Sequence, residues 1–253
     1  MTLTVDVHSH RSRLPEYFVT GVTGLPRIRP GDDLASLLSA AIELRAGDVL
    51  VVAQKLISKA EGREVDLSAV VPSPEAVEIA SDDGDARVIE LILREATSIV
   101  RRRGSFLVAE TRHGFICAAA GVDRSNTSAP DHVILLPLDP DASANALRDA
   151  LGCDVAVVIS DSFGRPFRLG TTGVALGCAG LEPLVAHTGE SDDSGRVLQG
   201  TEINIADQLA SAAELVMGAF GGVPAARIRG YAWRPGTRGA RALVLPVERD
   251  LFR

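Results

Sequence analysis

The chain of 253 residues is poor in several residue types, and each shortage argues against a kind of core, site or partner. Aromatic residues make up only 4%, so aliphatic side chains must fill the core. The three cysteines, Cys117, Cys153 and Cys178, stand in apolar surroundings without CxxC spacing, which argues against disulfides and against a cysteine-ligated metal. A net charge of −7 argues against a broad positive field, which general nucleic-acid or anionic-membrane binding would need. We therefore expect neither nucleic acid nor membrane as a partner.

The sequence has no apolar run of membrane-spanning length, and its first residues lack a basic segment followed by an apolar stretch. We expect a cytoplasmic protein. Hydrophobic residues make up 46% of the chain, enough for the core of one large domain or two modest ones.

Lysine is the scarcest charged residue. Of 26 basic residues only Lys55 and Lys59 are lysines, and both lie in the segment QKLISKAEGR at 54–63. One interpretation is that the composition simply favours arginine. The other is that a phosphate at this place needs a compact ammonium, which a planar guanidinium does not reproduce. Composition alone leaves both open.

Periodic patterns predict helices and strands along the whole chain. A turn at 30–33 precedes apolar residues at one-face helical spacing, and an uninterrupted apolar run follows at strand length. The predicted helices are 34–42, 87–102 and 204–218, and the predicted strands are 49–53, 105–110, 115–120, 132–137 and 154–159. These patterns favour an α+β fold with mixed sheets and packed helices. They predict one catalytic unit over 1–253 and leave open its division into two interleaved lobes.

Neither a P-loop nor a strand-linked GxGxxG occurs, so a nucleotide would need a different phosphate cradle. Three stretches, 54–63, 120–126 and 160–170, each combine turn-forming residues with charge. Asp123 and Asp161 lie in the last two, and with Ser162 they offer the hard oxygen ligands that Mg²⁺ or Mn²⁺ prefers. The alternative for each aspartate is that it caps its own turn.

Two further groups of residues have competing interpretations. Arg165 and Arg168 suit a phosphate or carboxylate clamp, although loop arginines are commonly solvated or ion-paired. His8 and His10 share one face of a short segment, a spacing similar to the opening motif of metal-dependent hydrolases. The other histidines, at 113, 132 and 187, form no second motif, which favours ordinary exposed histidines.

Six segments occur in the order found in one family and span about residues 21–230. They are GLPRIRPGDDL, VVAQKLISKAEGR, HGFICAAAGVDRSN, LLPLDPDASANALR, VVISDSFGRPFRLG and IADQLASAAELVMG. Together they resemble the coenzyme F420-0:γ-glutamyl ligase family.

The resemblance implies a GTP-dependent ligase that joins L-glutamate to the phospholactyl carboxylate of F420-0 and extends a γ-linked tail. It also implies Mg²⁺ or Mn²⁺, assistance by K⁺, and an intertwined homodimer. By position, metal falls on Asp123, Asp161 and Ser162. As our own hypothesis, and not as part of the resemblance, Lys59 contacts a phosphate and Arg165 or Arg168 holds an incoming carboxylate. The implied nucleotide site comprises Leu25, Pro26, Arg27, Ile28, Gln54, Lys55, Lys59, Asn126, Met217, Gly218, Ala219, Phe220, Gly221 and Gly222.

The chain departs from the family pattern at two positions. Ala219 stands where the family commonly has Glu or Gln as a further metal ligand, and Ala119 stands where many members have Asn. Water or a nearby acid would have to replace the missing ligand, and the acids considered are Glu190, Asp192, Asp193 and Glu214. Two alternatives therefore remain: a metal-dependent hydrolase using His8 and His10, or a GTP-binding homologue without ligase activity.

Overall fold

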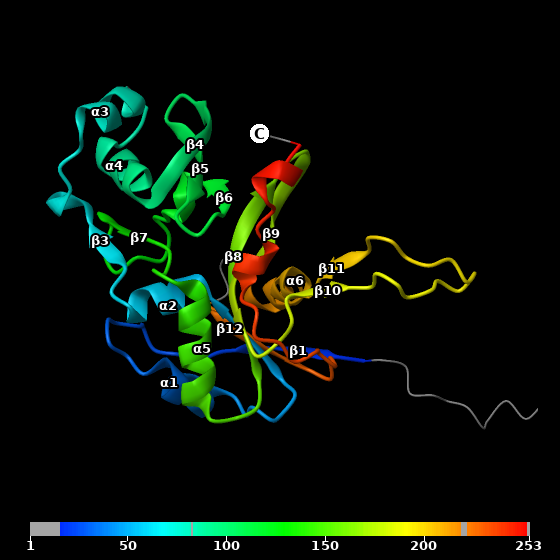
Figure 1. The fold of residues 1–253 in the computed structure, drawn as a ribbon. Helices are drawn as coiled ribbons and strands as arrows, with labels where there is room; N and C mark the ends of the chain where they lie inside the picture. Colours follow the sequence, from blue (N-terminus) through cyan, green and yellow to red (C-terminus); the bar gives the residue numbers. More distant parts are fainter. Residues whose placement is uncertain (1–15, 82, 219–221, 252–253) are drawn as a thin grey trace, which may run out of the picture.

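The computed structural model describes residues 16–81, 83–218 and 222–251. Its centre is a five-stranded mixed sheet in the order β1-β12-β2-β8-β9, in which β2 and β8 are parallel and the other neighbours antiparallel (Figure 1). The strands are β1 (Phe18–Val22), β2 (Val49–Ala53), β8 (Ala156–Arg165), β9 (Arg168–Ala179) and β12 (Ala225–Arg229). β2 and β8 are almost wholly buried where they pair, as expected for parallel strands covered on both faces.

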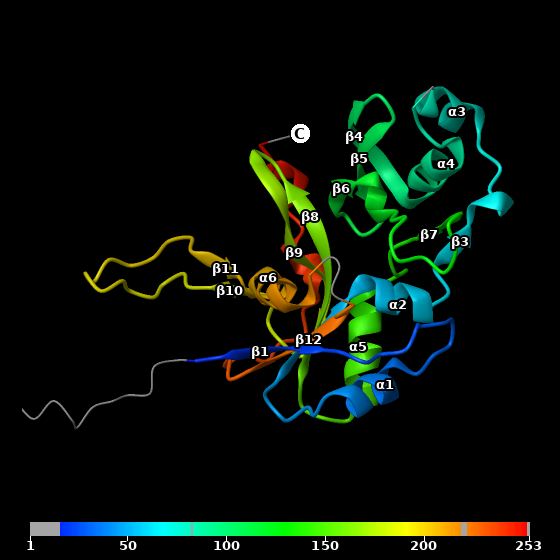
Figure 2. The same ribbon diagram turned by 180° about the vertical axis from the view of Figure 1, so that it is seen from behind.

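Helices cover both faces of this sheet (Figure 2). One face packs against α1 (Leu34–Ala41), α2 (Gln54–Ala60) and α5 (Pro140–Leu151), and the other against α6 (Ile205–Met217). Two glycines of β9 permit this close packing. A Cβ at Gly177 would lie 2.2 Å from the carbonyl oxygen of Pro140, and one at Gly173 would lie 2.5 Å from that of Ala210. Larger residues there would push α5 or α6 off the sheet.

Residues 64–134 form a second lobe with its own apolar core, inserted between α2 and α5. Both views place it beside the distal part of the β8–β9 hairpin (Figures 1 and 2). Its elements are β3 (Glu64–Asp66), η1 (Leu67–Ala69), α3 (Pro74–Ala80), α4 (Ala86–Glu95), β4 (Ala96–Arg103), β5 (Phe106–Thr111), β6 (Ile116–Ala118), η2 (Ala119–Gly121) and β7 (His132–Ile134). Glu95 ties it to the first lobe, because its carboxylate accepts from Arg63 (2.9 Å); the other carboxylate oxygen accepts from Arg112 of the same lobe (2.8 Å).

Two further segments complete the described chain. β10 (Leu184–Ala186) and β11 (Glu202–Asn204) pair at the base of a loop that extends away from the body (Figure 1). The C-terminal segment carries the short 3-10 helices η3 (Ala240–Leu243) and η4 (Val247–Arg249). No helix in the described part of the chain combines the length and apolar content needed to cross a membrane.

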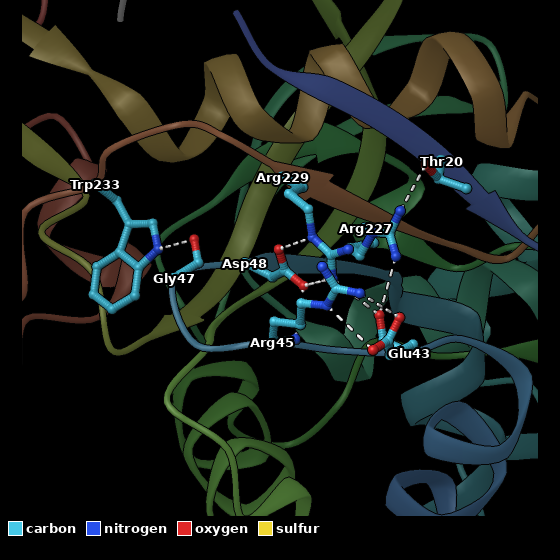
Figure 3. A network of polar contacts seen from close by, with 8 residues as sticks. All are labelled: Thr20, Glu43, Arg45, Gly47, Asp48, Arg227, Arg229 and Trp233. Atoms are coloured by element: carbon cyan, nitrogen blue, oxygen red, sulfur yellow. Dashed lines mark hydrogen bonds and ion pairs between the residues drawn. The ribbon is translucent and has the colours of Figure 1, made fainter.

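A polar network closes the sheet at the end where β2 begins (Figure 3). Asp48, only 2% exposed, accepts from Arg229 at 2.7 and 2.6 Å and from the Arg45 main-chain N–H at 2.8 Å. Arg227 donates to the Glu43 carbonyl (3.0 Å), and so joins β12 to the segment before β2.

The predicted elements are largely confirmed, with two corrections. The helix after Asp33 is present with the expected polar N-cap, and the helix ending at Met217 is present with Asn204 as its N-cap. The predicted helix 87–102 is wrong beyond Glu95, because its second half is strand β4, which turns at Gly104 into β5. β-branched residues at 97, 99 and 100 favour the strand, and the three arginines that follow belong to it. Asp161 lies within β8 and not in a turn after it.

Candidate functional site

The site forms where the parallel pairing of β2 and β8 ends. Ala53 and Ser160 are the last parallel partners; beyond them β2 leads into α2, and β8 continues into its hairpin with β9. Side chains at the carboxyl ends of adjacent parallel strands lie close together, and such edges commonly carry binding sites. Lys55 of α2 and Asp161 of β8 therefore come into the same region.

Lys55 links α2 to the loop that follows η2. Its Nζ lies 2.6 Å from Asp123 Oδ2 and donates to Ser125 Oγ at 2.6 Å. The second oxygen of Asp123 accepts from the Ser125 main-chain N–H at 2.6 Å. Burial raises the pKa of Asp123, but these donors outweigh it and hold the pKa below its ordinary value. Asp123 is thus a carboxylate kept ionised beside an ammonium.

Lys59 lies one helical turn further along α2. Its Nζ donates to the Asn126 carbonyl oxygen at 2.6 Å, and Asn126 has a left-handed φ of 59° that turns this carbonyl toward the helix. Burial lowers the pKa of Lys59; Glu64 opposes the shift, while Lys55 and Arg27 add to it. These positive charges are close enough to influence one another, and they form the small local field that phosphate requires.

Asp161 has the most perturbed acidity among the site residues. Burial raises its pKa to about 7, the negative charges of Asp123 and Glu214 add to the shift, and the Ser162 main-chain N–H and Lys55 only partly offset it. A carboxyl in such surroundings is ionised at little cost only when a cation is near. Asp161 also helps to raise the pKa of buried Cys117 to about 12, so that thiol stays protonated.

Ser162 points to the other face of β8. Successive strand residues alternate between faces, and Ile159 and Asp161 share the α2 side, whereas Val158 and Ser162 share the α6 side. The Ser162 hydroxyl donates to the Glu214 carboxylate on α6.

The oxygen donors have the right chemistry for a hard divalent cation, which prefers carboxylate and hydroxyl oxygens. Asp161 supplies a half-buried carboxyl, Asp123 a second, and the Ser162–Glu214 pair a third group nearby. Within the described ranges, however, no three His, Cys, Asp or Glu side chains already converge at ligand spacing. The residues fit such an ion only if Asp123 exchanges its contact with Lys55 for it.

The other predicted nucleotide residues occupy varied environments. Leu25 and Ile28 pack against the core beside α1 and α2, which leaves Pro26 and Arg27 between them exposed. Gln54 is 1% exposed, and its Nε2 finds no hydrogen-bond partner among the described residues. Met217 ends α6 and its side chain lies in the core between α6 and the sheet, whereas Gly218 and Gly222 are exposed with positive φ. Ala219, Phe220 and Gly221 lie outside the described residues.

Arg165 and Arg168 are brought together but lie away from the aspartates. They pair across the tip of the β8–β9 hairpin, and both are exposed. Arg165 is four positions after Asp161, about 13 Å along a strand. In this chain the two arginines do not contact the Lys55–Asp123 cluster.

Of the acids considered in place of the residue at 219, Glu214 touches a predicted site residue, Ser162. Glu190 instead pairs with His187 at 2.7 Å, and Asp192 accepts from main-chain groups of the same loop. Asp193 lies in that loop too. His8 and His10 lie outside the described residues.

Ser125 and Glu64 were missed as individual site residues. Ser125 stands two positions after Asp123, and an aspartate side chain commonly accepts from the main-chain N–H two residues later. The sequence therefore contained a signal for this contact. Glu64 follows α2 and accepts from the Ser128 main-chain N–H, so it braces the 123–128 loop against Lys59. No local pattern would have found that contact.

Comparison with known proteins places these residues in a wider context. The family described as F420-0:Gamma-glutamyl ligase matches residues 23–230. A coenzyme F420:L-glutamate ligase of Methanopyrus kandleri is 48% identical over 239 aligned residues, which cover 90% of this chain and 94% of the relative. One of Methanothermobacter thermautotrophicus is 46% identical over 246, covering 92% and 97%. A third, of Methanocaldococcus jannaschii, is 43% identical over 236, covering 90% and 94%.

Proposed function

Because the chain belongs to the F420-0:γ-glutamyl ligase family, we propose that it is a GTP-dependent ligase of coenzyme F420 biosynthesis. It joins L-glutamate to the phospholactyl carboxylate of F420-0 and then extends the tail through γ-linkages. The observation that carries the proposal is the cluster in which Lys55 contacts Asp123 and Lys59 contacts Asn126, close to the half-buried Asp161. Three segments that bear the family resemblance supply these residues.

An unactivated carboxylate does not form an amide with an amine at neutral pH, so the reaction needs an activation step. In the proposed route a carboxylate oxygen of F420-0 attacks the γ-phosphorus of GTP, the bond to the leaving GDP breaks, and an acyl phosphate forms. The glutamate amine then attacks the acyl carbon, inorganic phosphate leaves, and the amine loses a proton. Positioning and neutralisation of negative charge supply most of the acceleration in such transfers.

The lysines suit this task. Lys59 stands over the Asn126 turn with Arg27 near it, and its ammonium can exchange the Asn126 carbonyl for a phosphate oxygen. Gln54, whose Nε2 has no hydrogen-bond partner among the described residues, offers an amide donor at the start of the same helix. Arg165 or Arg168 would hold the carboxylate of an incoming substrate. Because both arginines lie at the tip of the β8–β9 hairpin, the substrate would have to extend to that tip.

Asp123 and Asp161 would hold Mg²⁺ or Mn²⁺, with Ser162 and Glu214 adjoining. When bound, such an ion neutralises phosphate charge during the transfer. Lys55 keeps Asp123 ionised and ordered before the ion arrives, since its ammonium already occupies one carboxylate oxygen. Glu214 provides the carboxylate that position 219 lacks, and K⁺ is proposed as an accessory ion.

We also propose a cytoplasmic homodimer in which two copies intertwine. Support comes from the segments that extend from the body: the loop between β10 and β11, and the β8–β9 hairpin (Figure 2). Phe167 near the hairpin tip and Leu215 on α6 are 89% and 87% exposed, which suits burial against a second copy.

Product mass tests the proposal. Purified protein is mixed with F420-0, L-glutamate, GTP and Mn²⁺, and the expected result is a mass gain of one or more glutamyl residues with release of GDP. Binding of GTP without any glutamylated product would overturn ligase activity in favour of a nucleotide-binding homologue. Replacing GTP with ATP is the control for nucleotide specificity.

The same assay addresses the hydrolase alternative. The double substitution His8→Ala and His10→Ala should leave ligase turnover unchanged. Complete loss of turnover, with the fold retained by circular dichroism, would restore the histidines as site residues.

A further inference from the structure

A cavity of about 230 Å³ lies along the β8–β9 hairpin, and its lining residues are separate from those of the proposed phosphate site. It is bounded by β9, by the turn that leads into β6, and by the C-terminal segment. Its apolar lining includes Phe115, Ile116, Phe163, Val174, Leu243 and Val244. Ligand pockets for whole small molecules occupy about 300–1,000 Å³. This cavity therefore suits one ring system rather than an entire substrate.

Two residues of the cavity lining, Phe163 and Val174, lie close to Asp161 in the β8–β9 hairpin. Phe163 follows Asp161 by two residues on the same side of β8, about 7 Å along the strand. Val174 is the direct cross-strand partner of Asp161. A substrate whose carboxyl lies at Asp161 can therefore place its other end in the cavity.

Aromatic side chains line the cavity, although they are scarce in this chain. Phe115 and Phe163 meet edge to face, with centroids 6.5 Å apart and an interplanar angle of 72°. His113 stacks on Phe115 at 5.6 Å and fixes the orientation of its ring. Both phenylalanines remain partly exposed, so apolar ring surface is available for stacking.

Two acidic residues, Asp207 and Asp250, complete the lining. Asp207, near the start of α6, accepts from the Ala175 main-chain N–H at 2.8 Å and from Asn204 Nδ2 at 2.7 Å. Two carboxylate oxygens have about four lone-pair positions in all, so Asp207 retains capacity for another donor. A ring N–H of a planar heterocycle is such a donor.

We infer that this cavity binds the flavin-like aromatic ring of the acceptor, between the Phe115–Phe163 pair and the C-terminal segment. The inference rests on the proposed function, because it assigns the part of the acceptor that does not react. The ring stacks on the phenylalanines, Asp207 accepts its N–H, and the flexible linker of the acceptor runs along β8 to the carboxyl at Asp161. Binding energy from the ring then helps to position the carboxyl for reaction.

The test fills the cavity from the C-terminal segment, which forms one of its walls. Val244→Trp places a large side chain in the cavity, and Val247→Trp, on the same segment but 62% exposed and outside the lining, is the matched control. Affinity for F420-0 is measured through the fluorescence of its ring, and affinity for GTP by calorimetry. Val244→Trp should weaken F420-0 binding at least about tenfold, the factor that 1.4 kcal/mol of lost contact gives. GTP binding should not change, and the control should behave like wild type.

A second variant guards against misfolding. Phe115→Leu keeps an apolar side chain but removes the aromatic face, and should weaken F420-0 several-fold while leaving binding of phospholactate, which lacks the ring, unchanged. Equal F420-0 affinity in wild type, Val244→Trp and Phe115→Leu would overturn the assignment. A Val244→Trp variant that changes the oligomeric state but leaves F420-0 affinity unchanged would overturn it as well. If wild-type protein neither binds nor glutamylates F420-0, the proposed function itself fails, which is a different result.

Discussion

Replacing Asp161 with Asn should make the protein more stable and inactive at the same time. Burial raises the Asp161 pKa from an ordinary 3.8 to about 7. A raised carboxyl pKa means that the folded state resists ionisation, so stability is full below pH 3.8 and falls as the pH rises toward 7. This difference in pKa corresponds to a loss of about 4 kcal/mol in the free energy of unfolding at pH 8. Asn removes the charge while its side-chain oxygen can still accept the Ser162 main-chain N–H.

Urea unfolding at pH 4 and at pH 8, without divalent ions, measures this effect. Asp161→Asn should match wild type at the lower pH and exceed it by up to about 4 kcal/mol at the higher pH. Asp123→Asn is the matched control with the opposite sign: its carboxylate is stabilised by Lys55, so losing the charge should destabilise the protein. Mn²⁺ should raise the melting temperature of wild type and not of Asp161→Asn, because an ion that binds only the folded state stabilises it. A gain below about 1.4 kcal/mol at pH 8 would refute the reasoning, since it would mean that Asp161 ionises without a bound cation.

Three further predictions concern other parts of the molecule. Asp48→Asn should lower the free energy of unfolding by about 3 kcal/mol, because it breaks a buried ion pair with Arg229. Glu43→Gln, in the exposed part of the same network, should change the free energy of unfolding little. Equal urea midpoints for the two variants would contradict this prediction. Lys59→Met should reduce kcat in the glutamylation assay by about 10²–10³-fold through loss of a charge on phosphate, and wild-type turnover in a folded variant would remove Lys59 from the site. Ala119→Asn should raise the unfolding free energy by about 0.5–1 kcal/mol, because Ala119 has a φ of 53° that Asn adopts more readily; calorimetry showing a loss would argue against this backbone explanation.

The sequence predicted the parts of the fold in which local pattern and final environment agree. α1 and α6 have a polar N-cap followed by apolar residues at helical spacing, and β2 is an uninterrupted apolar run, so each was recognisable in isolation. The segment 87–102 could not be divided correctly by periodicity, because its apolar spacing continues across Glu95. What ends the helix there is tertiary: Glu95 is held by Arg63 and Arg112, and the residues after it pair with β5.

The sequence predicted which segments contribute residues to the candidate site, but it did not predict how their side chains are arranged in space. Lys55, Asp123 and Asp161 stood out by residue type and by family resemblance, and the structure brings them together. That Ser162 faces Glu214 follows from strand alternation, but only once β8 is known to continue past Asp161. The separation of Arg165 and Arg168 from the aspartates likewise depends on the hairpin that carries them.

The position of the second lobe in the chain has a consequence for how the protein folds. The parallel partners Val49 and Ala156 are 107 residues apart (156 − 49), and the lobe at 64–134 lies between them. Closing so long a loop costs entropy before any contact between β2 and β8 is gained, and contacts distant in sequence generally slow folding. The inserted lobe has its own core and mostly local contacts, so it can form before the sheet closes. Lys55 then meets Asp123 and Asp161 only in the last stage of assembly, and a chain that has not finished folding has no place to bind its substrates.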